Sequence, residues 1–146
     1  YTVLSALFVA LPETVQAQAL DRSGGALKGP FFSEVFVFAP LSADVKRLSA
    51  GAPVLTNRLE IASQLTYHGV HASIVGGAPQ VPQWTAWYGD SLASRNLIVT
   101  FDPLTQDPDL GMRITSLCAR TSSGPRLRYR FAGTEAAVFY TAWCYR

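Results

Sequence analysis

Apolar residues occur along the chain in short runs, separated by polar segments and by segments rich in glycine or proline. Residues 31–39 (FFSEVFVFA) are almost all aromatic or β-branched, which predicts a strand that ends at Pro40. Residues 43–48 fit one helical turn. A longer helix is predicted after Thr56, where five apolar residues recur at roughly helical spacing. They are Leu59, Ile61, Ala62, Leu65 and Val70.

The rest of the chain is typical of strands and turns. Apolar or alternating runs predict five more strands, at residues 71–75, 96–101, 112–120, 126–131 and 137–145. The segments between them predict an aromatic loop and three turns, at residues 78–94, 102–111, 121–125 and 132–135. A strand, a helix and then successive antiparallel strands indicate an α+β fold, with one main helix packed on a mostly antiparallel sheet.

An apolar N-terminal arm at residues 1–20 precedes a glycine-rich linker at residues 21–30, which leaves residues 31–146 as a single domain. Pro12 and the small residues Ala17 and Ala19 give the arm the form of the rear half of a secretory signal. Its first eleven residues span only ~17 Å as a helix, against ~30 Å of hydrocarbon. The alternatives are part of a membrane anchor, an interfacial segment, a partner-binding arm or an element of the core. Its anchoring residues are Tyr1, Leu4, Leu7, Phe8 and Leu11.

Composition favours a globular chain that makes contacts. Hydrophobic residues make up 49% of the 146 residues and charged residues 15%, below the typical ~25%. A chain so poor in charge buries much of its surface or uses it to bind. The net charge of +2 is too small to indicate a nucleic-acid partner.

The cysteines and histidines predict a disulfide and no metal site. An arm that resembles an export signal places the chain outside the cytosol, where Cys118 and Cys144 are expected to pair; two buried free thiols are the alternative. His68 and His71 lack a third ligand at a recognisable spacing, so we interpret them as residues at a helix end. No cofactor is predicted.

One tetrapeptide, Gly89-Asp90-Ser91-Leu92, resembles the block that names the GDSL lipases and esterases. That resemblance implies a nucleophilic serine with a histidine base near the C-terminus. No histidine follows His71 in this chain, so the base is missing. A helical turn capped by Asp90 or Ser91 is the simpler interpretation.

Two groups of side chains are candidates for binding. Arg126, Arg128 and Arg130 alternate along a predicted strand and would share one face, suited to an anionic headgroup or an acidic partner. A solvated, edge-protecting face is the alternative. The aromatic loop contributes three side chains typical of interfaces, which are Trp84, Trp87 and Tyr88. A loop folded back over the sheet is the alternative.

The sequence therefore favours a non-enzymatic component of a membrane-associated protein assembly, periplasmic or extracellular, that serves as a structural or interaction subunit. Its expected partners are other protein subunits, with a membrane surface or anchor as a further one and no nucleic acid. The alternative is a small secreted hydrolase or ligand-binding domain that uses the segment around Ser91.

Overall fold

The structure is a computed structural model that describes Val15 and residues 30–75, 81–89, 92–131 and 134–146. The N-terminal arm from Tyr1 to Leu11 and nearly all of the linker lie outside the described residues, so both stay predictions. The chain divides into two units. The described part of the smaller unit is Val15 and residues 30–37, 128–131 and 134–137. The larger unit contains the remaining described residues from Phe38 onward.

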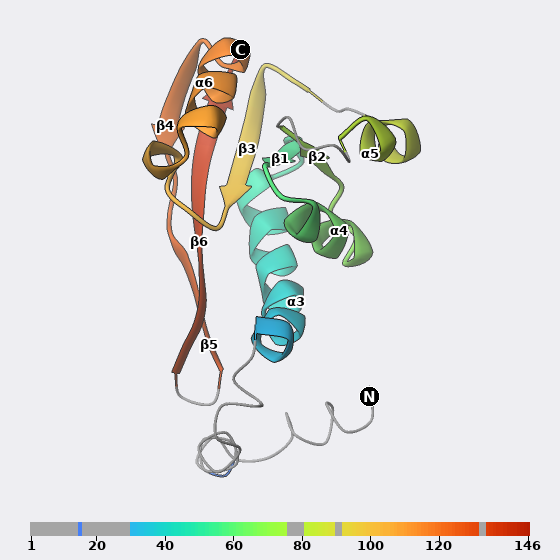
Figure 1. Cartoon of the computed structure of the whole chain (residues 1–146), viewed down its shortest axis with the longest axis vertical. Coiled ribbons are helices and arrows are strands. Elements are labelled where there is room, and N and C mark those ends of the chain that lie inside the picture. The colour runs from blue at the N-terminus through green and yellow to red at the C-terminus, as the bar shows by residue number, and fades with distance from the viewer. Residues whose placement is uncertain (1–14, 16–29, 76–80, 90–91, 132–133) are drawn as a thin grey trace. The chain divides into compact units, whose positions relative to one another are not determined.

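The fold is mixed α+β, with several helices and a six-stranded mixed sheet (Figure 1). The strand order is β2-β1-β3-β6-β4, and β5 also pairs with β6. The strands are β1 Val54–Thr56, β2 Ala72–Ile74, β3 Arg95–Thr100, β4 Arg120–Ser123, β5 Leu127–Phe131 and β6 Thr134–Tyr145. The helices are α3 Pro30–Ser49, α4 Leu59–Tyr67, α5 Val81–Tyr88, the short 3-10 helix η1 Leu104–Gln106 and α6 Pro108–Leu117.

The sheet is parallel on the side of β1 and β2 and antiparallel where β6 pairs with β3 and β4. β1 runs parallel to both β2 and β3, with Val54 opposite Ala72 and Leu97. β6 runs antiparallel to β3 and to β4. The expected mostly antiparallel sheet with one main helix is therefore correct only in part. Short helices connect the first three strands, as the crossover between parallel strands of one sheet requires.

Helix α3 corrects the strand predicted at residues 31–39. From residue 38 on, buried side chains recur every three or four residues, at Phe38, Leu41, Val45 and Ser49. This helical period continues past Pro40, which lies inside the helix and is exposed. The β propensity of the aromatic and β-branched residues gave the wrong state, because local propensity is a weak signal that tertiary packing overrides.

Helix α6 corrects the strand predicted at residues 112–120. Its N-cap is Asp107, whose Oδ1 accepts a hydrogen bond of 3.0 Å from the backbone N–H of Leu110. Pro108 occupies the first turn, where its missing N–H costs nothing. Leu110 and Ile114 are buried one turn apart. The segment interpreted as a polar turn is thus the start of a capped helix.

Three shorter segments also differ from the sequence prediction. The expected aromatic loop contains α5, and the expected turn at residues 121–125 contains most of β4. The three-residue strand β1 was not predicted. The strands predicted at residues 71–75, 96–101, 126–131 and 137–145 are confirmed as β2, β3, β5 and β6, and the helix predicted after Thr56 is α4.

Helices α3 and α6 pack on opposite faces of the sheet. α6 contributes Leu110 and Ile114 to a buried cluster that includes Ile98 and Ala142. On the other face, the ring of Phe38 in α3 meets that of Phe139 in an edge contact, with centroids 5.8 Å apart. Residues 139 and 142 of β6 point to opposite faces because side chains alternate along a strand. Both faces of the central strands are therefore buried.

The Cys118–Cys144 disulfide is confirmed. Cys144 lies in β6, as expected. Cys118 was also expected in a strand, but it is the C-cap of α6. The Cα atoms of the two residues are 5.3 Å apart. Both residues belong to the buried cluster beneath α6. The bond therefore ties the end of the helix to the strand on which it packs.

In the smaller unit, the carboxylate of Glu135 lies 3.9 Å from the guanidinium of Arg128, and both side chains are more than half exposed. Such a pair contributes little to stability.

Across all the described residues, no helix has both the length and the apolar character needed to cross a lipid bilayer. The expectation of a single domain over residues 31–146 stays a prediction.

Replacing both cysteines, as Cys118→Ala with Cys144→Ala, should lower the free energy of unfolding by roughly 3 kcal/mol, because the bond closes a 26-residue separation. Denaturant unfolding with and without a reductant measures the difference. A wild-type midpoint that does not respond to reductant would contradict the prediction, and the double variant is the control that reductant should leave unchanged.

Gly124 is predicted to tolerate no side chain. A Cβ atom there would overlap Oγ1 of Thr141 and lie 3.2 Å from that residue's carbonyl oxygen. Gly124→Ala should therefore cost about 1–3 kcal/mol of stability. Gly111→Ala is the matched control: its Cβ would lie 3.7 Å from the nearest oxygen, within α6, so alanine should add about 0.5–1 kcal/mol. Equal effects of the two substitutions in denaturant unfolding would refute this prediction.

Candidate functional site

The two tryptophans of α5 have different roles. Trp84 is 5% exposed, and its Nε1–H donates a hydrogen bond of 3.0 Å to the carbonyl oxygen of Ala72 in β2. Trp87 lies three residues later and is 68% exposed. The side chain of Tyr88 lies outside what the structure describes. Trp84 therefore anchors α5 to the sheet, while Trp87 faces solvent.

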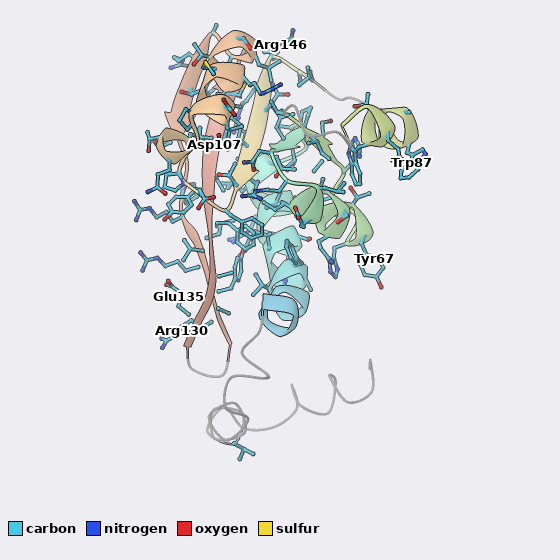
Figure 2. All side chains as sticks on the ribbon, viewed as in Figure 1. Tyr67, Trp87, Asp107, Arg130, Glu135 and Arg146 are labelled. Carbon is cyan, nitrogen blue, oxygen red and sulfur yellow. A yellow bond between two sulfur atoms is a disulfide. The ribbon has the colours of Figure 1, made fainter. Side chains whose placement is uncertain are left out.

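Tyr67, at the C-terminal end of α4, is a second large aromatic side chain in solvent. It is 83% exposed, and its ring makes an edge contact with His68, with centroids 5.1 Å apart. Figure 2 shows Tyr67 and Trp87 projecting outward from α4 and α5, and both helices pack on β2. Sequence reasoning missed Tyr67. It lies off the buried stripe formed by Ile61, Ala62 and Leu65, and that position was the available signal.

The arginines at 126, 128 and 130 are all exposed, and Leu127 and Tyr129 between them are half-buried, as strand alternation requires. Their environments differ along the strand. The guanidinium of Arg126 lies 5.3 Å from the ring centroid of Tyr140. Arg128 forms the exposed ion pair with Glu135 described above. A binding role for these arginines stays a prediction.

Two further arginine–aromatic contacts were not anticipated. The guanidinium of Arg95 lies 3.7 Å from the ring centroid of Trp143, and that of Arg120 lies 4.4 Å from the centroid of Tyr145. Arg95 begins β3 and Arg120 begins β4, and both pair across the sheet with Tyr145. The contacts depend on strand register, which no local pattern in the sequence reveals.

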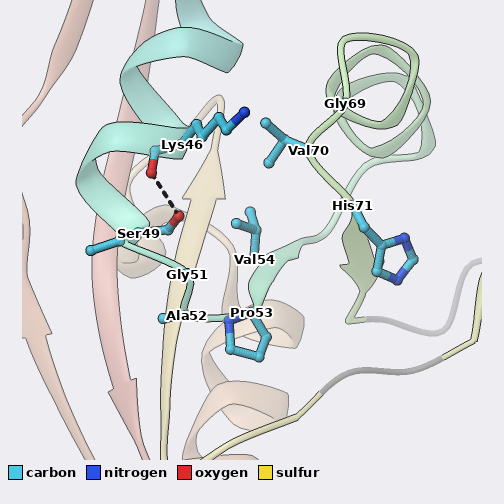
Figure 3. A pocket seen from close by; sticks show the side chains of 10 residues that line it. Lys46, Ser49, Gly51, Ala52, Pro53, Val54, Gly69, Val70 and His71 are labelled. Carbon is cyan, nitrogen blue, oxygen red and sulfur yellow. Dashed lines mark hydrogen bonds between the residues drawn. The ribbon is translucent and has the colours of Figure 1, made fainter.

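A hollow of about 520 Å³ lies where α3 ends and the chain enters β1 (Figure 3). Two titratable side chains line it, Lys46 and His71. Oγ of Ser49 donates a hydrogen bond of 3.2 Å to the carbonyl oxygen of Lys46. The other lining residues are small or apolar: Ala50, Gly51, Ala52, Pro53, Val54, Gly69 and Val70. The polar groups of the lining side chains are thus one amine, one hydroxyl and one imidazole, and the hydroxyl is engaged with a backbone carbonyl.

The two histidines lie in different environments. His68 is exposed and forms the C-cap of α4, where its backbone N–H donates to Gln64, and His71 is half-buried at the hollow. In the part of the chain that the structure describes, no three His, Cys, Asp or Glu side chains are grouped as a metal site requires. Asp90 and Ser91 lie outside the described residues, so their relation to a base stays untested.

Comparison with known proteins gives no match: no family model, no curated protein and no solved structure is significantly similar to the chain.

The roles of the two tryptophans can be separated by one substitution type. Trp84→Phe removes a buried hydrogen bond to Ala72 and should lower the free energy of unfolding by about 1–3 kcal/mol, because the carbonyl oxygen of Ala72 loses this donor. Trp87→Phe changes an exposed ring and should stay within about 0.5 kcal/mol of wild type. Denaturant unfolding of both variants tests the assignment, and a larger loss for Trp87→Phe would reverse it.

Proposed function

We propose that this chain is a non-enzymatic interaction subunit of a membrane-associated protein assembly, placed in the periplasm or outside the cell. The observation that carries the proposal is the pair of solvent-facing aromatic side chains, Tyr67 at 83% and Trp87 at 68% exposure. Tyrosine and tryptophan are enriched in protein interfaces and among the few residues whose truncation weakens binding most.

Both rings are supported by a buried anchor in their own helix. In α4, Ile61 and Leu65 are fully buried, and in α5 the hydrogen-bonded Trp84 is buried. A helix fixed in this way presents its exposed ring at low cost in conformational entropy, since little motion is left to lose on binding. Rigid presentation supports a contact surface over a mobile surface loop.

The disulfide supports the compartment. Cys118 and Cys144 are both buried, and no free cysteine is found among the described residues. Disulfides of this structural kind persist in oxidising environments and are rare in the cytosol. Together with the signal-like pattern of the first twenty residues, the pair supports export. Association with a membrane rests on that apolar arm alone.

The proposal predicts that the aromatic pair retains a partner. Tyr67→Ser with Trp87→Ser should reduce the fraction of the chain found in a complex by about tenfold, without changing its unfolding midpoint. Native size of the detergent-extracted full chain, read with cross-linked masses, measures the complex.

Met112→Ser is the matched control, because Met112 is 67% exposed on a different helix, α6. It should leave the complex intact. A wild-type chain that stays monomeric after mild extraction would refute the proposed function, and so would an equal loss of complex in the control.

A further inference from the structure

A row of three paired residues crosses the sheet at the end of β6. Tyr145 lies opposite Arg95 of β3 on one side and opposite Arg120 of β4 on the other. Residues directly opposite in neighbouring strands point to the same face. The two guanidinium groups therefore flank one tyrosine on one face of the sheet, the face that also carries Trp143, two residues earlier.

Both guanidinium groups are stacked on rings. Arg95 lies 3.7 Å above the centroid of Trp143, and Arg120 lies 4.4 Å above that of Tyr145. The rings are half-buried and the arginines exposed. Stacking uses the flat face of a guanidinium and leaves the N–H groups at its edge able to donate. The arrangement holds two donor forks in fixed orientations toward solvent.

Among the described residues, no carboxylate forms an ion pair with Arg95 or Arg120. The ion pairs of Arg47 with Asp44 and of Arg128 with Glu135 lie elsewhere. Arg146, the exposed residue after β6, adds a third cation at the same strand end (Figure 2). Its backbone N–H donates a hydrogen bond to the carbonyl oxygen of Ser94. Arg95 and Arg120 lie on one face two strands apart, so their like charges repel each other at low ionic strength. An anion at this face would relieve the repulsion.

We propose that this arginine–aromatic face (Arg95, Arg120, Trp143 and Tyr145) binds an acidic peptide segment of a protein partner. This inference rests on the proposed function and specifies the chemistry of a partner. A planar guanidinium fork fits a carboxylate with two parallel hydrogen bonds. The rings lie half-buried under the arginines, so they are poorly placed to enter a bilayer as aromatic anchors. Charge complementarity thus favours an acidic peptide over a lipid surface.

The test uses the purified full chain and a fluorescein-labelled peptide of alternating glutamate and serine, followed by fluorescence anisotropy at low ionic strength. Arg95→Gln with Arg120→Gln should raise the Kd about tenfold, because two charge-assisted contacts are lost. Arg58→Gln with Arg113→Gln is the matched control. It removes the same charge from two exposed arginines on α4's N-cap and on α6, and it should change the Kd by less than about twofold.

A second double variant separates the effect of guanidinium geometry from that of charge. It also provides a test if the glutamine double variant does not fold. Arg95→Lys with Arg120→Lys keeps both charges but loses the planar, stacked forks. It should bind more weakly than wild type by about threefold. If circular dichroism shows that the glutamine variants are unfolded, the lysine variants carry the test, and wild-type affinity in them then overturns the proposal.

Three other results overturn it as well. They are a wild-type chain that does not bind the peptide, an equal loss in the Arg58 and Arg113 control, and binding to phosphatidylglycerol vesicles in place of the peptide. None of these outcomes bears on Tyr67 and Trp87. The proposed function fails only in the experiment on native size, so the two failures are distinguishable.

Discussion

The antiparallel pairing of β3 with β6 is the interaction on which the larger unit depends. Six residues of each strand are in register, from Arg95 opposite Tyr145 to Thr100 opposite Tyr140. β3 also pairs with β1, so this ladder joins the parallel strands to the antiparallel ones. Leu97, Ile98 and Val99 are at most 1% exposed. Helices cover both faces of the ladder, which is why a continuous apolar run, not an alternating one, marks the strand.

Because side chains alternate along β6, its two faces make different contacts. Ala142 and Cys144 point toward α6, where the cluster and the disulfide fix the helix to the sheet. Trp143 and Tyr145 point the other way and lie under the guanidinium groups of Arg95 and Arg120. At this end of β6 the strand thus contributes to the buried cluster on one face and holds charged groups in place on the other, and a shift of one residue in register would exchange the two sets.

The parts of the fold that the sequence predicted are those whose signal is local. The apolar run of β3 is sufficient to indicate a strand, and the amphipathic stripe of α4 is sufficient to indicate a helix. α3 and α6 were wrong for two different reasons. In α3, the β propensity of the aromatic and β-branched residues outweighed the helical period that the buried residues from Phe38 onward show. In α6, Asp107 and Pro108 form a recognisable start signal, but residues 102–111 were interpreted as a turn.

The candidate binding surfaces were harder to predict from the sequence than the fold. Trp84 and Trp87 are the same residue type three positions apart, yet one is buried and one exposed. Residue type predicted an interface for both, whereas the helical position separates them. Arg95 and Arg120 lie in different strands, and only the shared neighbour Tyr145 brings them into one row. The three arginines at 126, 128 and 130 were visible in the sequence because they alternate locally. An uncompensated pair created by register has no local signature, so it becomes visible only once the sheet is known.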